Sequence, residues 1–413
     1  MERYEPSLPQ EINQGSQQAA RPHRSWKLGQ RAAQGTLVLL LCAGGFLSLF
    51  PLGRAFTRSA LLLPALLTAS EPPPLAAAGD AIRFTRLTLF PNTSRTVDLD
   101  IYEPATPPPP IPGGREVIID VPGAGDQRSL GQLVNLSQSL AREGIIDVNV
   151  GTPELFDYRV SAQEGQAVVQ AFELMERWPG VNPRHIGIIT FSVGSLLAYD
   201  AAADPRIRDK VAFVGTLGGY ADVTTLLRTM GTRSQDINGQ TQRWEPIATT
   251  PYVLYRSVGY LFSPADQKLL QKAFPFSIGF PPPLPAAQVA RLSPAGAAYY
   301  HLLEGDQAGN VNRNLAALSP SLKALFAQLS PLSVISQIRA PIHLLHERSD
   351  PAVPYSQDVE MAAALARLHH PYDLAAYTIF EHVVVNLKSS LNQTLSDGSK
   401  LLGVLTSIML VGS

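Results

Sequence analysis

The residue whose setting has the clearest chemical content is Ser192, because it stands between an apolar run and a segment suited to a helix. A serine hydroxyl is a poor nucleophile unless a neighbouring base takes its proton. A sharp strand-to-helix turn that presents such a serine requires small residues two positions before and two positions after it. Gly194 fills the later position, and Thr190 fills the earlier one, where glycine is usual. The pattern predicts a nucleophile at Ser192, with an ordinary helix-capping serine as the alternative and Ser195 as the next candidate.

Two further side chains complete the arrangement that a serine nucleophile needs. Asp350 follows an apolar run that ends near His346, and His382 follows the last strand-like run of the chain. Hydrolases of this strand-turn-helix type carry serine, acid and histidine in that order along the chain. The acid orients the imidazole and stabilises its cationic form, and the imidazole acts as the general base. We therefore predict Asp350 as the acid and His382 as the base, with Glu347 and Asp222 as alternative acids.

The oxyanion that forms during acyl transfer needs two preorganised backbone N–H donors. One donor comes from the residue after the nucleophile and the other from the loop after an earlier strand. Val193 and Ala124 hold these places, since Ala124 lies in a Pro-Gly-Ala-Gly turn that follows the apolar run 117–121. Such a turn taken alone is more often simply a turn.

The elements that must position these residues follow from the hydrophobic pattern. Period-2 alternation over 82–90 and 97–102 predicts an antiparallel entry hairpin. After it, short β-branched runs alternate with amphipathic segments, which is typical of a parallel sheet. The predicted strands are 117–121, 145–150, 185–191, 211–217, 342–346 and 374–380, and the predicted helices are 130–143, 161–178, 193–203, 356–369 and 383–392.

One long stretch interrupts this alternation. No strand-like run recurs between Gly219 and Ala340, while proline, aromatic and leucine residues stay frequent. A loop of that length is improbable in a compact domain unless it has a structure of its own. We therefore predict a largely helical cap over about 220–338, above the edge of the sheet where the parallel strands end. The closing run 401–411 is shorter than a bilayer span and predicts a terminal helix docked on the sheet.

Over 117–217 and 341–385 the sequence resembles the α/β-hydrolase superfamily, particularly its dienelactone-hydrolase-like and acyl-peptidase-like branches found as membrane-anchored bacterial enzymes. Segment 184–195 resembles their nucleophile strand, 350–354 their acid loop and 381–382 their histidine turn. The resemblance implies an α/β-hydrolase fold, with a mostly parallel twisted sheet and helices on both faces. The insertion resembles nothing that we can name, and substrate choice would be encoded there.

These residues predict a serine hydrolase that cleaves a carboxylic ester or a related acyl bond through an acyl-enzyme on Ser192. The expected partner is a small-molecule acyl substrate, and the chemistry requires neither a metal nor an organic cofactor. An acyltransferase with the same triad, a peptidase and a catalytically silent protein of this fold are the alternatives. The abundance of leucine, phenylalanine, tyrosine and proline in the insertion favours an apolar acyl or alcohol group, although ordinary packing has the same composition.

Composition excludes several other classes of function. The 413 residues carry a formal net charge of −1 with 16% charged residues, and outside the N-terminus the basic residues are scattered. A nucleic-acid-binding surface is therefore not expected. The single cysteine, Cys42, rules out an intramolecular disulfide, a cysteine zinc site and a cysteine nucleophile in the globular part.

The N-terminal region predicts a membrane anchor. Residues 1–35 form a polar tail, and 36–53 form an apolar stretch that is just long enough for a single span. More basic residues precede the stretch than follow it, which places the tail in the cytoplasm and the folded domain outside it. Residues 54–80 would then form a linker to an α/β-hydrolase domain over 81–413. A cleaved signal peptide, which would give a secreted protein, and a buried helix are the alternatives.

Overall fold

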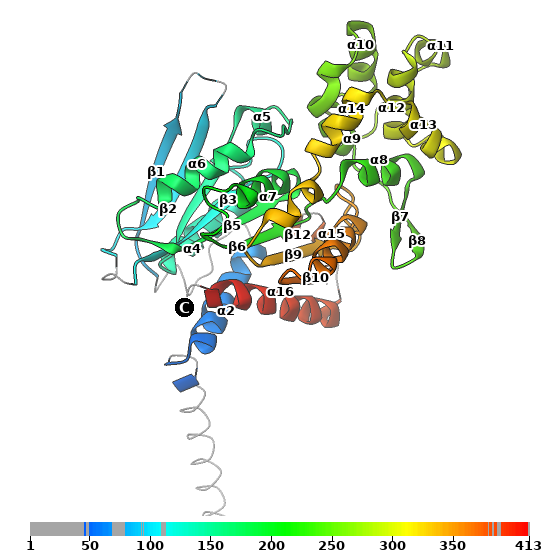
Figure 1. Ribbon diagram of the computed structural model, residues 1–413. Helices are drawn as coiled ribbons and strands as arrows, with labels where there is room; N and C mark the ends of the chain where they lie inside the picture. Colours follow the sequence, from blue (N-terminus) through cyan, green and yellow to red (C-terminus); the bar gives the residue numbers. More distant parts are fainter. Residues whose placement is uncertain are drawn as a thin grey trace, which may run out of the picture.

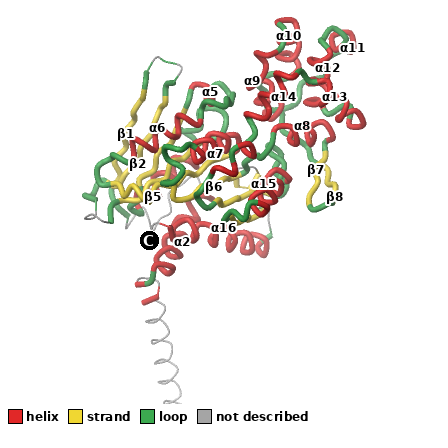
Figure 2. Tube along the Cα trace, in the orientation of Figure 1, coloured by secondary structure: helices red, strands yellow, loops and turns green. Residues whose placement is uncertain are grey.

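The computed structural model describes residues 45–46, 49–67, 79–91, 93, 95–108, 113–378, 380–381, 384–385 and 390–411. A twisted sheet forms the centre of the molecule, with helices on both of its faces and a helical cap beyond one edge (Figures 1 and 2). His382 lies outside the described residues, as do the polar tail at 1–35, most of the apolar stretch at 36–53 and part of the predicted linker.

Eight strands form the main sheet, in the order β1-β2-β4-β3-β5-β6-β9-β10. The strands are β1 (Ile82–Leu89), β2 (Val97–Pro104), β3 (Arg115–Val121), β4 (Ile146–Gly151), β5 (Val181–Phe191), β6 (Val211–Leu217), β9 (Ile342–Glu347) and β10 (Tyr372–Tyr377). The first two strands pair antiparallel, β2 pairs antiparallel with β4, and all later pairs are parallel. The C-terminal ends of β3, β5, β6 and β9 therefore meet at one edge of the sheet.

The two faces of the sheet bury separate apolar clusters, because successive side chains of a strand point to opposite faces. On β3, Val117, Ile119 and Val121 enter the larger cluster, whereas Ile118 enters the smaller one. The larger cluster is covered by α6 (Gly165–Met175), α7 (Ser195–Ala203) and α15 (Ser356–Arg367), and the smaller one by α2 (Pro51–Leu67), α4 (Gly131–Arg142) and α16 (Leu391–Val411). We call the face of the sheet with the larger cluster the α7 face and the face with the smaller cluster the α4 face.

The predicted cap is largely helical. Its helices are α8 (Val223–Thr232), α9 (Thr249–Val258), α10 (Pro264–Ala273), α11 (Ala286–Val289), α12 (Pro294–Glu304), α13 (Val311–Ala317) and α14 (Pro320–Gln328). Several begin with a serine or aspartate that caps the helix, such as Ser263, Ser293 and Asp222. The expectation that this region contains no strand is wrong, because β7 (Ser234–Ile237) and β8 (Gln240–Arg243) form a two-stranded hairpin within it.

The predicted parallel strands are present, with boundaries that differ by a few residues at most. The predicted helix at 383–392 is wrong, because β11 (Phe380–Glu381) pairs there with β12 (Val384–Val385) and α16 begins only at Leu391. The closing apolar run does form a helix docked on the sheet, since α16 packs against β6, β10 and α2. A short helix, α5 (Pro153–Phe156), follows β4.

The membrane anchor is a prediction that the structure corrects. Among the described residues, which include 45–46 and 49–67 of the N-terminal region, no helix is both long enough and apolar enough to cross a membrane. Helix α2, which overlaps only the last residues of the predicted stretch and otherwise lies in the predicted linker, packs against α4 and α16, and its Ala55, Leu62 and Ala65 are buried. The single-pass topology, and the extracytoplasmic placement that depended on it, are therefore not retained.

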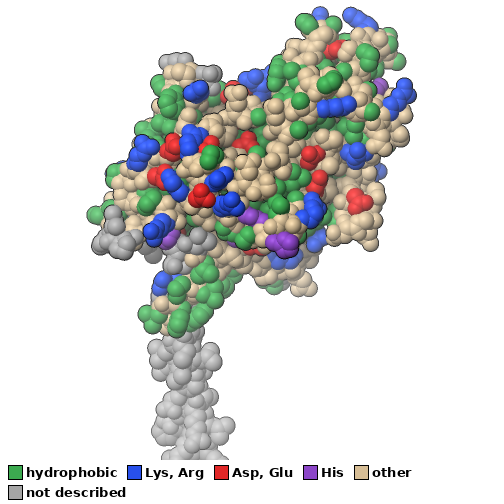
Figure 3. Space-filling model, in the orientation of Figure 1, with side chains coloured by type: hydrophobic (Ala, Val, Ile, Leu, Met, Phe, Trp, Pro, Cys, Tyr) green, Lys and Arg blue, Asp and Glu red, His purple; other side chains and the backbone are tan. Residues whose placement is uncertain are grey.

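The surface carries charges of both signs. On the face shown in Figure 3, Lys and Arg side chains are interspersed with Asp and Glu side chains over the sheet domain, and hydrophobic side chains gather on α2. Some of these charges are paired locally, as in the ion pairs of Arg243 with Glu245 and of Lys210 with Glu176.

Candidate active site

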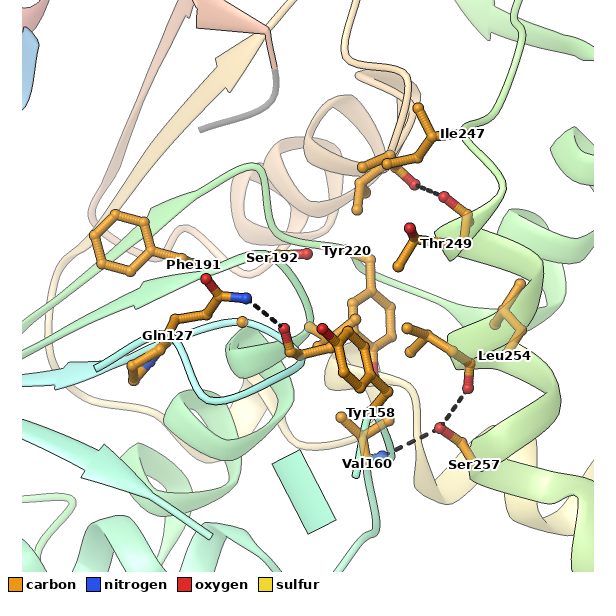
Figure 4. Close-up of a pocket in the computed structure, with 18 of the residues that line it drawn as sticks. Gln127, Tyr158, Val160, Phe191, Ser192, Tyr220, Ile247, Thr249, Leu254 and Ser257 are labelled. Atoms are coloured by element: carbon orange, nitrogen blue, oxygen red, sulfur yellow. Dashed lines mark hydrogen bonds between the residues drawn. The ribbon is translucent and has the colours of Figure 1, made fainter. Parts of the chain in front are cut away.

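Ser192 occupies a sharp turn between β5 and α7. Its φ angle is +54°, in the left-handed region that residues other than glycine rarely adopt. Backbone strain of this kind persists only where the surroundings enforce it, and it gathers at functional sites. In Figure 4 the Ser192 hydroxyl lies near the centre of a cavity, with Phe191 on one side and Thr249 and Leu254 on the other.

The packing around the turn explains both small positions. Thr190 is completely buried and its hydroxyl donates a 3.1 Å hydrogen bond to the carbonyl of Val121 on the neighbouring strand, so threonine fits where glycine is usual. At Gly194, by contrast, there is no space for a side chain. A Cβ at this position would lie 2.6 Å from the Pro122 carbonyl oxygen and 2.7 Å from both the Val121 carbonyl oxygen and Thr190 Oγ1.

Replacing Gly194 by alanine is expected to displace the turn, because two of the three atoms that its Cβ would meet belong to the backbone of the adjacent loop. Overpacking of this kind costs about 1–3 kcal/mol of unfolding free energy. Gly398→Ala in α16 is the matched control, because nothing lies within 4 Å of its added Cβ, and it should stabilise by up to about 1 kcal/mol. Urea unfolding of both variants tests this, and a Gly194→Ala variant as stable as the wild type would contradict it.

The two predicted oxyanion donors both border the cavity. Ala124 and Val193 line it together with Ser192, and neither backbone N–H donates to another described residue. The loop that carries Ala124 approaches the serine closely, since a Cβ at Gly123 would lie 3.2 Å from Ser192 Cβ. Gln127 braces this loop by donating from Nε2 to the Ala124 carbonyl at 2.9 Å.

Asp350 is fully buried in the loop after β9, two strands from β5 in the sheet. Its Oδ1 accepts hydrogen bonds from the backbone N–H groups of Ala352, at 2.7 Å, and Val353, at 3.0 Å. Both of these residues line the cavity that contains Ser192. The carboxylate is thus held at the same edge of the sheet as the serine, and Trp244 anchors its backbone by donating to the Asp350 carbonyl at 2.7 Å.

The alternative acids have structural partners. Asp222 caps α8 by accepting from the Thr225 N–H at 2.8 Å. Glu347 accepts from the Ser349 N–H at 2.9 Å within its own turn. His382 lies outside the described residues, and no described histidine lines the cavity. Ser195 is completely buried, and its hydroxyl accepts from the Tyr220 N–H at 3.3 Å.

Sequence reasoning missed the part played by His346, a completely buried residue beside the acid loop. Its Nε2 donates to the Val353 carbonyl at 3.0 Å and lies 3.6 Å from Asp350 Oδ2, while its Nδ1 lies 3.0 Å from Asp358 Oδ2. Burial by itself lowers the pKa of His346, but Asp358, Asp350 and the carbonyl raise it to about 9. The spacing His-x-x-x-Asp across a strand end was visible in the sequence, but Asp358 is brought in only by α15.

Because the pKa of His346 is raised when the protein folds, its contribution to stability is complete below about pH 6.5, the value expected in the unfolded chain. The contribution is lost as the pH rises through about 9. The wild-type free energy of unfolding should therefore fall between pH 6.5 and 9.5, by an amount on the order of 2–3 kcal/mol.

The control for this titration is a double variant, His346→Gln with Asp358→Asn, which removes both charges of the buried pair. Burial raises the pKa of Asp358 while His346 lowers it, so a single substitution would leave an uncompensated carboxyl. Urea unfolding at pH 6.5, 8 and 9.5 should show a smaller fall for the double variant than for the wild type. Equal slopes would exclude His346 as the titrating group.

The cavity has a volume of about 420 Å³, which is within the range of small-molecule sites. Its lining is predominantly apolar and contains no Asp, Glu, Lys, Arg or His side chain among the described residues. Of its two phenols, Tyr220 donates to the Leu329 carbonyl at 2.7 Å, and burial raises its pKa well above the ordinary value. Within the described part of the chain, no three His, Cys, Asp or Glu side chains are grouped so as to hold a metal ion.

Comparison with family models found no match, and neither did comparison with curated protein sequences. Solved structures do resemble the chain. A puromycin-hydrolysing peptidase from Mycobacterium tuberculosis shares 16% identity, over 81% of this chain and 39% of that one, with a TM-score of 0.47. Dipeptidyl peptidase 4 from Porphyromonas gingivalis shares 12%, over 79% and 36%, with a TM-score of 0.43. A 2,6-dihydroxy-pseudo-oxynicotine hydrolase shares 17% identity, over 79% of this chain and 68% of that one, with a TM-score of 0.41. This chain therefore spans well under half the length of the two peptidases.

The topology decides the fold. The eight-stranded sheet has an antiparallel second strand followed by parallel strands, in the order β1-β2-β4-β3-β5-β6-β9-β10. Helices cover both faces, and a serine in left-handed conformation stands at the turn from β5 into α7. The predicted fold class is confirmed: the chain has the α/β-hydrolase fold.

Proposed function

We propose that this protein is a serine hydrolase that cleaves a neutral, apolar carboxylic ester or related acyl compound. Ser192 is the nucleophile, His382 the general base and Asp350 the acid that orients the base. The observation that carries the proposal is the left-handed turn that holds the Ser192 hydroxyl in an apolar cavity beside the N–H groups of Ala124 and Val193.

In the proposed reaction His382 takes the proton of the Ser192 hydroxyl as its oxygen attacks the acyl carbon. The oxyanion that forms accepts hydrogen bonds from the Val193 and Ala124 N–H groups. His382 then gives the proton to the departing alcohol, which leaves an acyl-enzyme. Water activated by the same imidazole attacks the acyl carbon and releases the acid, so the sum is ester plus water to acid plus alcohol.

The character of the cavity favours an uncharged substrate. A substrate ammonium or carboxylate group would lose its hydration on entering, and the described lining offers no ionisable partner of opposite charge. The peptidases that resemble this chain in fold act, by their names, on peptides or on puromycin. A free peptide N-terminus would find no carboxylate among the described lining residues, and this favours an ester or an N-blocked acyl compound.

Labelling with a fluorophosphonate tests the proposal, because an activated serine displaces fluoride and retains the phosphonyl group. Mass spectrometry should locate the label on Ser192 in the full-length protein. A protein that is folded by circular dichroism and remains unlabelled, and that hydrolyses neither short nor long esters, would exclude the proposed function.

A further inference from the structure

The cavity at Ser192 joins the two faces of the sheet. Its lining includes Leu136 from the apolar cluster of the α4 face, and Phe326 and Leu329 from the cluster of the α7 face. The neighbours of the serine divide in the same way, because Phe191 packs against the first cluster and Val193 against the second. Ser192 therefore stands between two apolar regions that are otherwise separated by the sheet.

We define the two regions by their side chains. The α4 arm is formed by Leu133 and Leu136 of α4 together with Phe191 and Leu217 at the ends of β5 and β6. The cap arm is formed by Leu226 of α8, Val253 and Leu254 of α9, Phe326 of α14 and Leu329. In Figure 4 Phe191 and Leu254 lie on opposite sides of Ser192.

We propose that the substrate carries an apolar chain on each side of the bond that is cleaved, one in the α4 arm and the other in the cap arm. This inference rests on the proposed function of Ser192 and narrows its substrate class to esters of an apolar acid with an apolar alcohol. An acid with a polar or charged alcohol would place that group in an arm of leucine, valine and phenylalanine side chains.

Two features of the wall strengthen the inference. Two hydroxyl groups of the cap side are already engaged, since Ser257 Oγ accepts from the Val160 N–H and donates to the Val253 carbonyl, and Thr250 donates to the Ala352 carbonyl. At the rim, the side chain of Phe276 borders the cavity and is 60% exposed, and Ile278 nearby is fully exposed. Apolar surface therefore continues from the interior to the mouth.

The experiment uses two ester series with the purified full chain. In one series the acyl group grows from two to eight carbons with a constant short alcohol, and in the other the alcohol grows with a constant short acid. Wild-type kcat/KM should rise by roughly three- to fourfold per methylene in both series until an arm is filled, which is the factor expected for burying one methylene.

Leu133→Trp and Leu254→Trp fill one arm each. Each variant should lower kcat/KM at least tenfold for long chains in one series only, and the two variants should affect different series. Leu133→Ala and Leu254→Ala extend the same arms and should instead raise kcat/KM for long chains in the corresponding series. They replace a tryptophan variant that fails to fold. Leu368→Trp, on an exposed position at the end of α15, should change neither series.

The inference is overturned if wild-type kcat/KM ignores chain length in either series, or if both arm variants act on the same series. Either result would leave the proposed function standing, because the shortest ester would still be hydrolysed and Ser192 would still be labelled. A wild-type protein that neither hydrolyses the shortest ester nor is labelled at Ser192 would instead exclude the proposed function itself.

Discussion

Replacing Ser192 by alanine should lower kcat/KM for an ester substrate by at least about 10⁴-fold, because no other group then forms the acyl-enzyme. Labelling by the fluorophosphonate should disappear at the same time. The fold should be retained, since the side chain lies in the cavity rather than in either apolar cluster. Ester hydrolysis, labelling and thermal unfolding of the same preparation give the three readouts.

Ser195→Ala is the matched control for this experiment. Ser195 is completely buried and does not line the cavity, and its hydroxyl accepts a hydrogen bond from the Tyr220 N–H. Its alanine variant should therefore keep the label. A labelled Ser192→Ala variant, or an unlabelled but folded Ser195→Ala variant, would move the nucleophile away from Ser192.

The second large effect is expected for Asp350→Asn. Asparagine keeps an oxygen that accepts from the Ala352 and Val353 N–H groups, so the loop should retain its conformation. The negative charge that stabilises the imidazolium is lost, and the amide favours the wrong imidazole tautomer. Where this change has been made in a serine protease triad the loss in kcat is about 10⁴-fold, and we expect a fall of about 10³–10⁴-fold here.

Asp222→Asn supplies the comparison. This residue was an alternative acid, but its carboxylate caps α8 through the Thr225 N–H, a role that asparagine also fills. Activity of this variant should stay within about threefold of the wild type. If Asp222→Asn loses activity and Asp350→Asn does not, the acid has been assigned to the wrong strand end. The pH dependence of kcat/KM, measured on both variants, separates loss of the acid from a general loss of folded protein.

Local patterns were sufficient for most of the sheet domain. The apolar runs that became β3, β6, β9 and the second half of β5 are largely buried on both faces, so hydrophobicity alone marks them. The predicted helix at 383–392 failed because a short apolar run does not distinguish helix from strand. The predicted membrane anchor at 36–53 is contradicted by the described residues, because none of their helices is long enough and apolar enough to cross a membrane.

The sequence by itself determined the fold class, the largely helical nature of the cap and the candidacy of Ser192, Asp350 and His382, since each depends on patterns within a short segment. Only the tertiary structure decided which side chains share the cavity. The Val121 and Pro122 carbonyls close around Gly194 beside the left-handed Ser192, and Asp358 from a later helix supports the buried charge of His346. The two apolar arms come from helices over opposite faces of the sheet. Each of these involves groups that are distant in the chain, and packing, not local propensity, brings such groups together.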